Sequence, residues 1–156
     1  MRKQISIISL LVILLSIFLF SCSQKSYPTS EVNFISGKEG TITIRAIGIG
    51  KNEQKAIIDA EKNAFNVILF RGLPESVQKT ALVGTNENEE KERHKEYFNK
   101  FYNEEKYKTF VMSSIPVSAL IRHKGGEKSI SIDININLSA LRKDLEENNI
   151  IRKFGY

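Results

Sequence analysis

The most regular alternation of apolar and polar residues lies near the C-terminal end of the chain. Ile or Leu occupies every even position from 130 to 138, and Ser, Asp or Asn occupies the odd positions from 129 to 137. Upstream, apolar residues recur at odd positions between Val111 and Ile121. Gly125-Gly126 lies between the two runs and has the composition of a two-residue hairpin turn. The pattern predicts an antiparallel hairpin with one buried and one polar face.

The position of the turn also predicts the register of this hairpin. Pairing outward from Gly125-Gly126 places Ile121 opposite Ile130 and Ile115 opposite Ile136, so both strands bury their apolar residues on one face. Pro116 has no N–H group, which predicts an edge strand or a bulge at that position. We interpret the opposite, polar face as a solvated sheet surface rather than a ligand site.

A second strand and a helix are predicted nearer the N-terminus. Residues 41–49 alternate and are rich in β-branched side chains, as in strands. Asn52 is a suitable N-cap for a helix over about 53–71, which ends at Gly72 and Pro74. Three alanines at four-residue spacing indicate the face on which this helix lies close to a sheet: Ala56, Ala60 and Ala64.

Two more helices follow from composition and spacing. Residues 86–106 contain no Pro or Gly and many helix formers, with a charged first half and an aromatic stripe in the second half: Tyr97, Phe98, Phe101 and Tyr102. The stripe has two interpretations, a surface for a partner or glycan and a face that docks on the protein's own core, of which we favour the second. Ser139 is expected to cap a final helix over about 140–148.

These elements predict an α+β fold. Their order is β-α-α-β-β-α, and a three-stranded, mainly antiparallel sheet with helices on one face buries every apolar stripe.

The first residues have the composition of a signal peptide. Arg2 and Lys3 precede an apolar run from Ile5 to Phe20, which is short for a membrane span and suitable for a signal-peptide core. Leu19-Phe20-Ser21-Cys22 then resembles the lipobox of bacterial lipoproteins. The resemblance implies cleavage between Ser21 and Cys22, and attachment of Cys22 to fatty acyl chains such as palmitate, which bind the lipid bilayer.

Location and domain organisation follow from this resemblance. Ser23 stands where an Asp retains many lipoproteins at the inner membrane, so the expected location is the outer membrane, on its periplasmic or exposed surface. We predict a signal peptide over 1–21, a lipidated tether over 22–40 and one α+β domain over 41–156. The tether assignment rests on its polar composition, with Pro28, Gly37 and Gly40.

The remaining chemistry is sparse. Removing Arg2 and Lys3 lowers the net charge from +5 to +3, too little to indicate nucleic-acid binding. Cys22 is the only cysteine, and the two histidines, His94 and His123, have no metal-ligand spacing. The sequence from Gly48 to Gly50 before the helix lacks the third glycine of a dinucleotide-binding turn. We therefore expect no metal, no cofactor and no enzymatic activity.

Residues 41–76 resemble a known unit. A strand ending in Gly48-Ile-Gly50, a helix containing Asp59-Ala60 and Asn63-Ala64, and an Arg71-Gly72 turn are similar to the N-terminal unit of the twenty-kilodalton outer-membrane lipoprotein family. A related unit occurs in a periplasmic flagellar accessory protein. The resemblance implies an envelope lipoprotein of α+β fold without known catalytic residues.

Two functions remain open after the sequence analysis. The favoured one is a non-catalytic envelope lipoprotein that binds or scaffolds another envelope component, through the half-covered helix over 86–106. The alternative is a small cell-wall hydrolase or transferase that uses carboxylates the sequence does not single out.

Overall fold

A computed structural model describes residues 31–153 of the chain. The predicted signal peptide, the cleavage site at Ser21 and Cys22, and the first part of the tether lie outside these residues. The elements are β1 (Val32–Lys38), β2 (Thr41–Gly50), α2 (Glu53–Phe70), α3 (Glu87–Arg93), α4 (Lys95–Tyr102), the 3₁₀ helix η1 (Lys106–Phe110), β3 (Val111–Pro116), β4 (Ile121–Arg122), β5 (Lys128–Asn137) and α5 (Leu138–Glu147).

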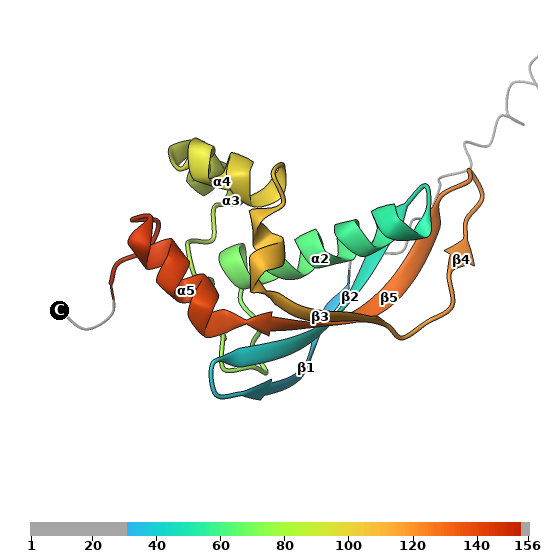
Figure 1. The fold of residues 1–156 in the computed structure, drawn as a ribbon, viewed down its shortest axis with the longest axis horizontal. Coiled ribbons are helices and arrows are strands. Elements are labelled where there is room, and N and C mark those ends of the chain that lie inside the picture. Colours follow the sequence, from blue (N-terminus) through green and yellow to red (C-terminus); the bar gives the residue numbers. More distant parts are fainter. Residues whose placement is uncertain (1–30, 154–156) are drawn as a thin grey trace, which may run out of the picture.

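The fold is α+β, with helices on one face of an antiparallel sheet (Figure 1). The strand order is β1-β2-β5-β3, and β4 pairs with β5 beyond the end of β3. The class and the antiparallel pairing agree with the sequence prediction. The predicted number of three strands is wrong, since the sheet has five. The predicted order β-α-α-β-β-α is also wrong, since β1 precedes β2 and three strands follow the 3₁₀ helix.

One additional strand lies within the predicted tether. β1 pairs antiparallel with β2 from Val32 opposite Ala46 to Lys38 opposite Thr41. Val32 and Phe34 pack against the core and supply the apolar contacts that a tether would lack. A bulge between Phe34 and Ser36 interrupts the alternation, so these residues do not show the period of a strand. Residues 32–38 are therefore part of the sheet.

The predicted strand over 111–121 is divided into β3 and β4. Between the pairs Pro116–Ile132 and Ile121–Ser129, the segment that joins β3 to β4 advances by five residues, whereas β5 advances by only three. The additional residues follow Pro116, which confirms the irregularity expected there. The predicted register is wrong from the turn onward: Ile121 pairs with Ser129 instead of Ile130, because the turn has one residue more than the predicted Gly125-Gly126 pair. With the two additional residues after Pro116, Ile115 then pairs with Asp133 instead of Ile136.

α2 forms as predicted and lies directly on β2. Asn52 caps it, because its side chain accepts a hydrogen bond from the N–H of Lys55 at 2.9 Å. The three alanines of its predicted face are fully buried: Ala56, Ala60 and Ala64. Gly48 and Gly50 therefore serve close packing, since a Cβ atom at either position would overlap the backbone of α2.

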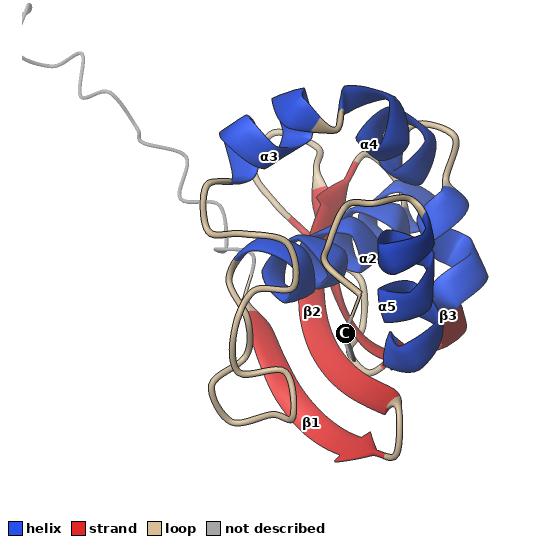
Figure 2. Cartoon of the chain, turned by 90° about the vertical axis from the view of Figure 1, so that its left-hand side faces the viewer, coloured by secondary structure: helices blue, strands red, loops and turns tan. Residues whose placement is uncertain are grey.

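The predicted helix over 86–106 is divided at His94, whose backbone is not helical. α3 buries none of its residues and is crossed by ion pairs such as Glu87–Lys91. α4 buries aromatic side chains against the core and lies, like α3, farther from the sheet than α2 (Figures 1 and 2). The break at His94 separates the solvated half of the segment, α3, from its buried half, α4.

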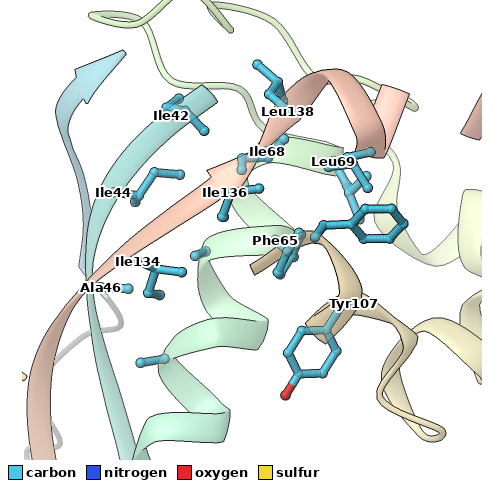
Figure 3. Close-up of a cluster of buried hydrophobic side chains, with 14 of the residues drawn as sticks. Ile42, Ile44, Ala46, Phe65, Ile68, Leu69, Tyr107, Ile134, Ile136 and Leu138 are labelled. Carbon is cyan, nitrogen blue, oxygen red and sulfur yellow. The ribbon is translucent and has the colours of Figure 1, made fainter. Parts of the chain in front are cut away.

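The chain passes from β5 directly into α5. The cap of this helix is Asn137, which accepts a hydrogen bond from the N–H of Ala140 at 2.9 Å, and not Ser139 as predicted. The alternating isoleucines of β5 face α2 in the core, as predicted (Figure 3). Tyr107 of η1 closes this core from the side of the helices.

Candidate functional site

The aromatic stripe lies in the core and not on the surface. Phe101 is fully buried, Tyr97 and Phe98 are almost so, and Tyr102 is half-buried. The ring of Phe101 meets that of Phe65 edge-on, with centroids 5.4 Å apart. Of the two interpretations of the stripe, docking on the protein's own core is therefore confirmed. These residues cannot form an exposed partner surface.

The hydroxyl groups of this region form hydrogen bonds within the protein. Tyr97 donates to a carboxylate oxygen of Asp144 at 2.8 Å, and the Lys106 ammonium group binds both oxygens of the same carboxylate at 2.7 and 2.8 Å. Burial, followed by the hydrogen bond to Asp144, raises the pKa of the Tyr97 phenol well above its ordinary range. Tyr97 is therefore neutral at physiological pH and serves as a donor.

A buried carboxylate connects α2 to the elements that follow the aromatic helix. Glu61 accepts a hydrogen bond from the Ser114 hydroxyl at 2.7 Å and another from the Tyr107 hydroxyl at 3.2 Å. Burial and the nearby Glu61 carboxylate raise the pKa of Tyr107. Glu61 thus has two donors within the protein, and we assign it a structural role.

The two histidines lie apart. Nε2 of His123 is 2.7 Å from the hydroxyl oxygen of Ser129, but Ser129 is only 4% exposed, so this hydroxyl is not presented to a substrate. His94 lies 3.9 Å from Glu90, at the break between α3 and α4. Within residues 31–153 no three His, Cys, Asp or Glu side chains gather as a metal site would require.

A cleft of about 470 Å³ lies between the start of α4 and the residues that follow α5. His94, Glu92 and Glu96 line it together with four cationic side chains: Arg93, Lys95, Lys100 and Lys106. Three of these cations form ion pairs, including Lys95 with Glu92 at 3.5 Å. The cleft therefore brings a histidine and carboxylates to one place, but in an exposed and largely charge-paired setting.

The most distinctive surface is the edge of the sheet formed by residues 111–122, which we call the β3–β4 edge. Four large apolar side chains are exposed along it: Met112 (59%), Ile115 (58%), Val117 (42%) and Ile121 (54%). No charged residue occurs between Phe110 and Arg122. Soluble proteins ordinarily protect exposed sheet edges with charged side chains, and an apolar edge indicates an interaction site.

The register explains why Ile115 is exposed. Ile115 pairs with Asp133, and Asp133 pairs with Arg45 of β2, so the three side chains form one row on the uncovered face of the sheet. Arg45 donates two hydrogen bonds to the Asp133 carboxylate, at 2.7 and 2.9 Å. These hydrogen bonds, together with the positive charge of Arg45, lower the pKa of Asp133.

Pro116 restricts how a partner can use the β3–β4 edge. The N–H of Val117 bonds to the carbonyl of Ser131, so the backbone groups of the residues on either side of Val117 point away from β5. Pro116 is one of them and has no N–H to donate. Continuous pairing with a further strand is interrupted at this point. The apolar side chains must therefore supply most of a partner's contacts.

Sequence reasoning missed this surface because alternation alone placed the apolar residues of 111–121 on the buried face. Two signals were nevertheless available. One is Pro116, which indicates an edge strand, and the other is the absence of charge over eleven consecutive residues.

No protein-family model matches the chain, and comparison with curated proteins and with solved structures found no significant match. The resemblance of residues 41–76 to an outer-membrane lipoprotein unit therefore stays a prediction. Among residues 31–153, no helix combines the length and the apolar character needed to cross a membrane.

Proposed function

We propose that this protein is a non-catalytic lipoprotein of the bacterial cell envelope, attached to the outer membrane through acylated Cys22. Its domain binds another envelope protein at the β3–β4 edge. The acyl chains supply attachment to the bilayer, and the domain supplies recognition.

The observation that carries the binding function is the exposure of Met112, Ile115, Val117 and Ile121 along one uncharged sheet edge. Four of the six exposed large apolar side chains of residues 31–153 lie within these ten positions. Exposing this much apolar surface to water is unfavourable in free energy, and a partner protein that covered the edge would remove that cost. A solvated structural edge would require polar or charged residues instead.

The lipid anchor is supported by the sequence around Cys22. The only cysteine of the chain follows an apolar run and a small residue, as lipoprotein acylation requires. Metabolic labelling with a fatty-acid analogue tests it directly: the wild type is expected to be labelled and Cys22→Ser to remain unlabelled. Label on Cys22→Ser would contradict the anchor.

Partner binding is tested with variants of the exposed residues. Ile115→Lys combined with Met112→Lys is expected to abolish co-purification of one specific envelope protein from detergent-solubilised membranes. Val77→Lys combined with Ile35→Lys is the matched control, because both positions are exposed and lie off the β3–β4 edge. All four substitutions spare the core, so thermal melting should be similar for both double variants. Equal recovery of the partner with both double variants would contradict the proposal.

The alternative function is a cell-wall hydrolase, and the cleft beside α4 is the observation that favours it. Purified full-length protein incubated with peptidoglycan would then release soluble fragments. Glu92→Gln or Glu96→Gln would abolish this release, whereas Glu147→Gln, on α5, would not. We expect no release from the wild type.

A further inference from the structure

The tether attaches to the domain at one end of the sheet. The N–H of Ile47 bonds to the carbonyl of Glu31 at 3.1 Å, which fixes the start of the described chain beside the last residues of β2. β5 begins at the same end, because Gly50 pairs with Lys128. The β4–β5 hairpin therefore lies at the end of the domain where the tether enters, whereas α5 lies at the opposite end (Figure 1).

The tether length limits how far this end can be from a bilayer. Nine Cα–Cα steps separate Cys22 from Glu31, and a chain of that length reaches at most about 30 Å. β5 has ten residues and spans about 33 Å, so α5 lies farther from the anchor than the hairpin by nearly the length of the sheet.

The β4–β5 hairpin itself has an excess of positive charge. The β4–β5 hairpin carries Arg122, Lys124 and Lys128 against one carboxylate, Glu127. Lys51 lies at the same end, and so do Glu31 and Glu53. None of the ion pairs found in residues 31–153 involves Arg122, Lys124 or Lys128. Their charges are thus available to an external anion.

The helix farther along the molecule has the opposite charge. α3 and its flanking residues contain four glutamates between 87 and 92, against Lys91 and Arg93. An anionic surface therefore attracts the hairpin end and repels α3.

We propose that the β4–β5 hairpin is a membrane-facing surface that contacts anionic lipid headgroups and holds the domain with its long axis away from the bilayer. This inference rests on the proposed acylation of Cys22. In this orientation the β3–β4 edge runs outward from the membrane and stays accessible to a partner.

The absence of other cysteines allows a direct test. Cys22 is the only cysteine, and acylation uses its thiol, so a cysteine introduced elsewhere is the single site for a fluorescent label. Gln54→Cys and Ser139→Cys form a matched pair: both are exposed, uncharged and in the first turn of a helix, at opposite ends of the sheet. The measurement is energy transfer from the label to acceptor lipids, with the full-length lipidated protein in vesicles containing phosphatidylglycerol.

We expect energy transfer from position 54 to be severalfold stronger than from position 139. The difference should shrink in vesicles of phosphatidylcholine alone and with Arg122→Gln combined with Lys124→Gln. It should persist with Lys79→Gln combined with Lys100→Gln, which removes two exposed cations elsewhere. Equal transfer from both positions, with protein that floats with the vesicles, would overturn the orientation and leave the lipid anchor intact. Protein that does not float would overturn the anchor, and the inference with it.

Discussion

Gly48 of β2 lies against Ala60 of α2 so closely that a Cβ atom at position 48 would be 2.7 Å from the Cβ of Ala60. The same atom would be 1.9 Å from the carbonyl oxygen of Ala56, which is less than any real contact. At this point the helix therefore packs on the strand through backbone and methyl groups. The glycines of this turn and the alanines of α2 serve one purpose, the short distance between α2 and the sheet.

Substitutions at this contact should be strongly destabilising. Gly48→Ala requires α2 to move, and Ala60→Leu overfills the same space, so each is expected to lower the free energy of unfolding by about 1–3 kcal/mol or more. Lys62→Leu, on the same helix but not fully buried, should change it by less than about 0.5 kcal/mol. Urea denaturation measures all three, and a neutral Ala60→Leu variant would show that the helix does not pack here.

The buried carboxylate of Glu61 offers a second comparison. Ser114→Ala removes the hydroxyl that donates to Glu61 at 2.7 Å and leaves a buried acceptor short of one partner. We expect a loss of about 1–3 kcal/mol in unfolding free energy. Ser113→Ala, one position earlier and exposed, should have almost no effect. Equal losses in the two variants would mean that the Glu61–Ser114 hydrogen bond does not stabilise the fold.

The same change, isoleucine to asparagine, at one position in each of two paired strands tests the observed register. Ile134→Asn places an unpaired amide in the core and should cost about 3 kcal/mol or more. Ile115→Asn, on the exposed face of β3, should change stability by less than about 0.5 kcal/mol. The register predicted from alternation would instead bury both side chains. Comparable shifts in a thermal melt would favour that register over the observed one.

The ion pair between Arg45 and Asp133 makes stability depend on pH. Because the pKa of Asp133 is lowered in the folded state, the pair stabilises the protein above the ordinary aspartate pKa of about 4. This contribution is lost as the pH falls through the folded-state pKa. Arg45→Gln should therefore melt at a slightly lower temperature than the wild type at neutral pH, and at the same temperature in strong acid. The difference should also shrink in high salt, since Arg45 is exposed. A constant difference across pH would contradict this origin.

The sequence predicted the parts of the fold in which local pattern and tertiary packing agree. The alternation of Ile130 to Ile136 requires a half-buried strand, and the spacing of Ala56, Ala60 and Ala64 requires close helix packing; both are observed. The strand β1 was missed because a bulge near Ile35 interrupts its alternation. The pairing of this strand with β2 is a tertiary feature, and local sequence does not show it.

The β3–β4 edge was predicted least well, for a related reason. The turn shifts the strand register by one position, since Ile121 pairs with Ser129 instead of Ile130, and a shift by an odd number of positions moves every side chain to the other face. The two residues inserted after Pro116 add an even shift, which keeps that change of face. Ile115 therefore looked buried by its parity and is exposed in the fold. The same shift created the surface that we assign to partner binding.

The most direct test of this assignment is site-specific photo-crosslinking in intact cells. A photoreactive amino acid at Ile115 should crosslink this protein to one specific envelope protein, and the crosslink should disappear when Met112→Lys is added. The same amino acid at Val77, which is 68% exposed and lies off the β3–β4 edge, should give no such product. Identical products from positions 115 and 77, or none from position 115, would contradict partner binding at this edge.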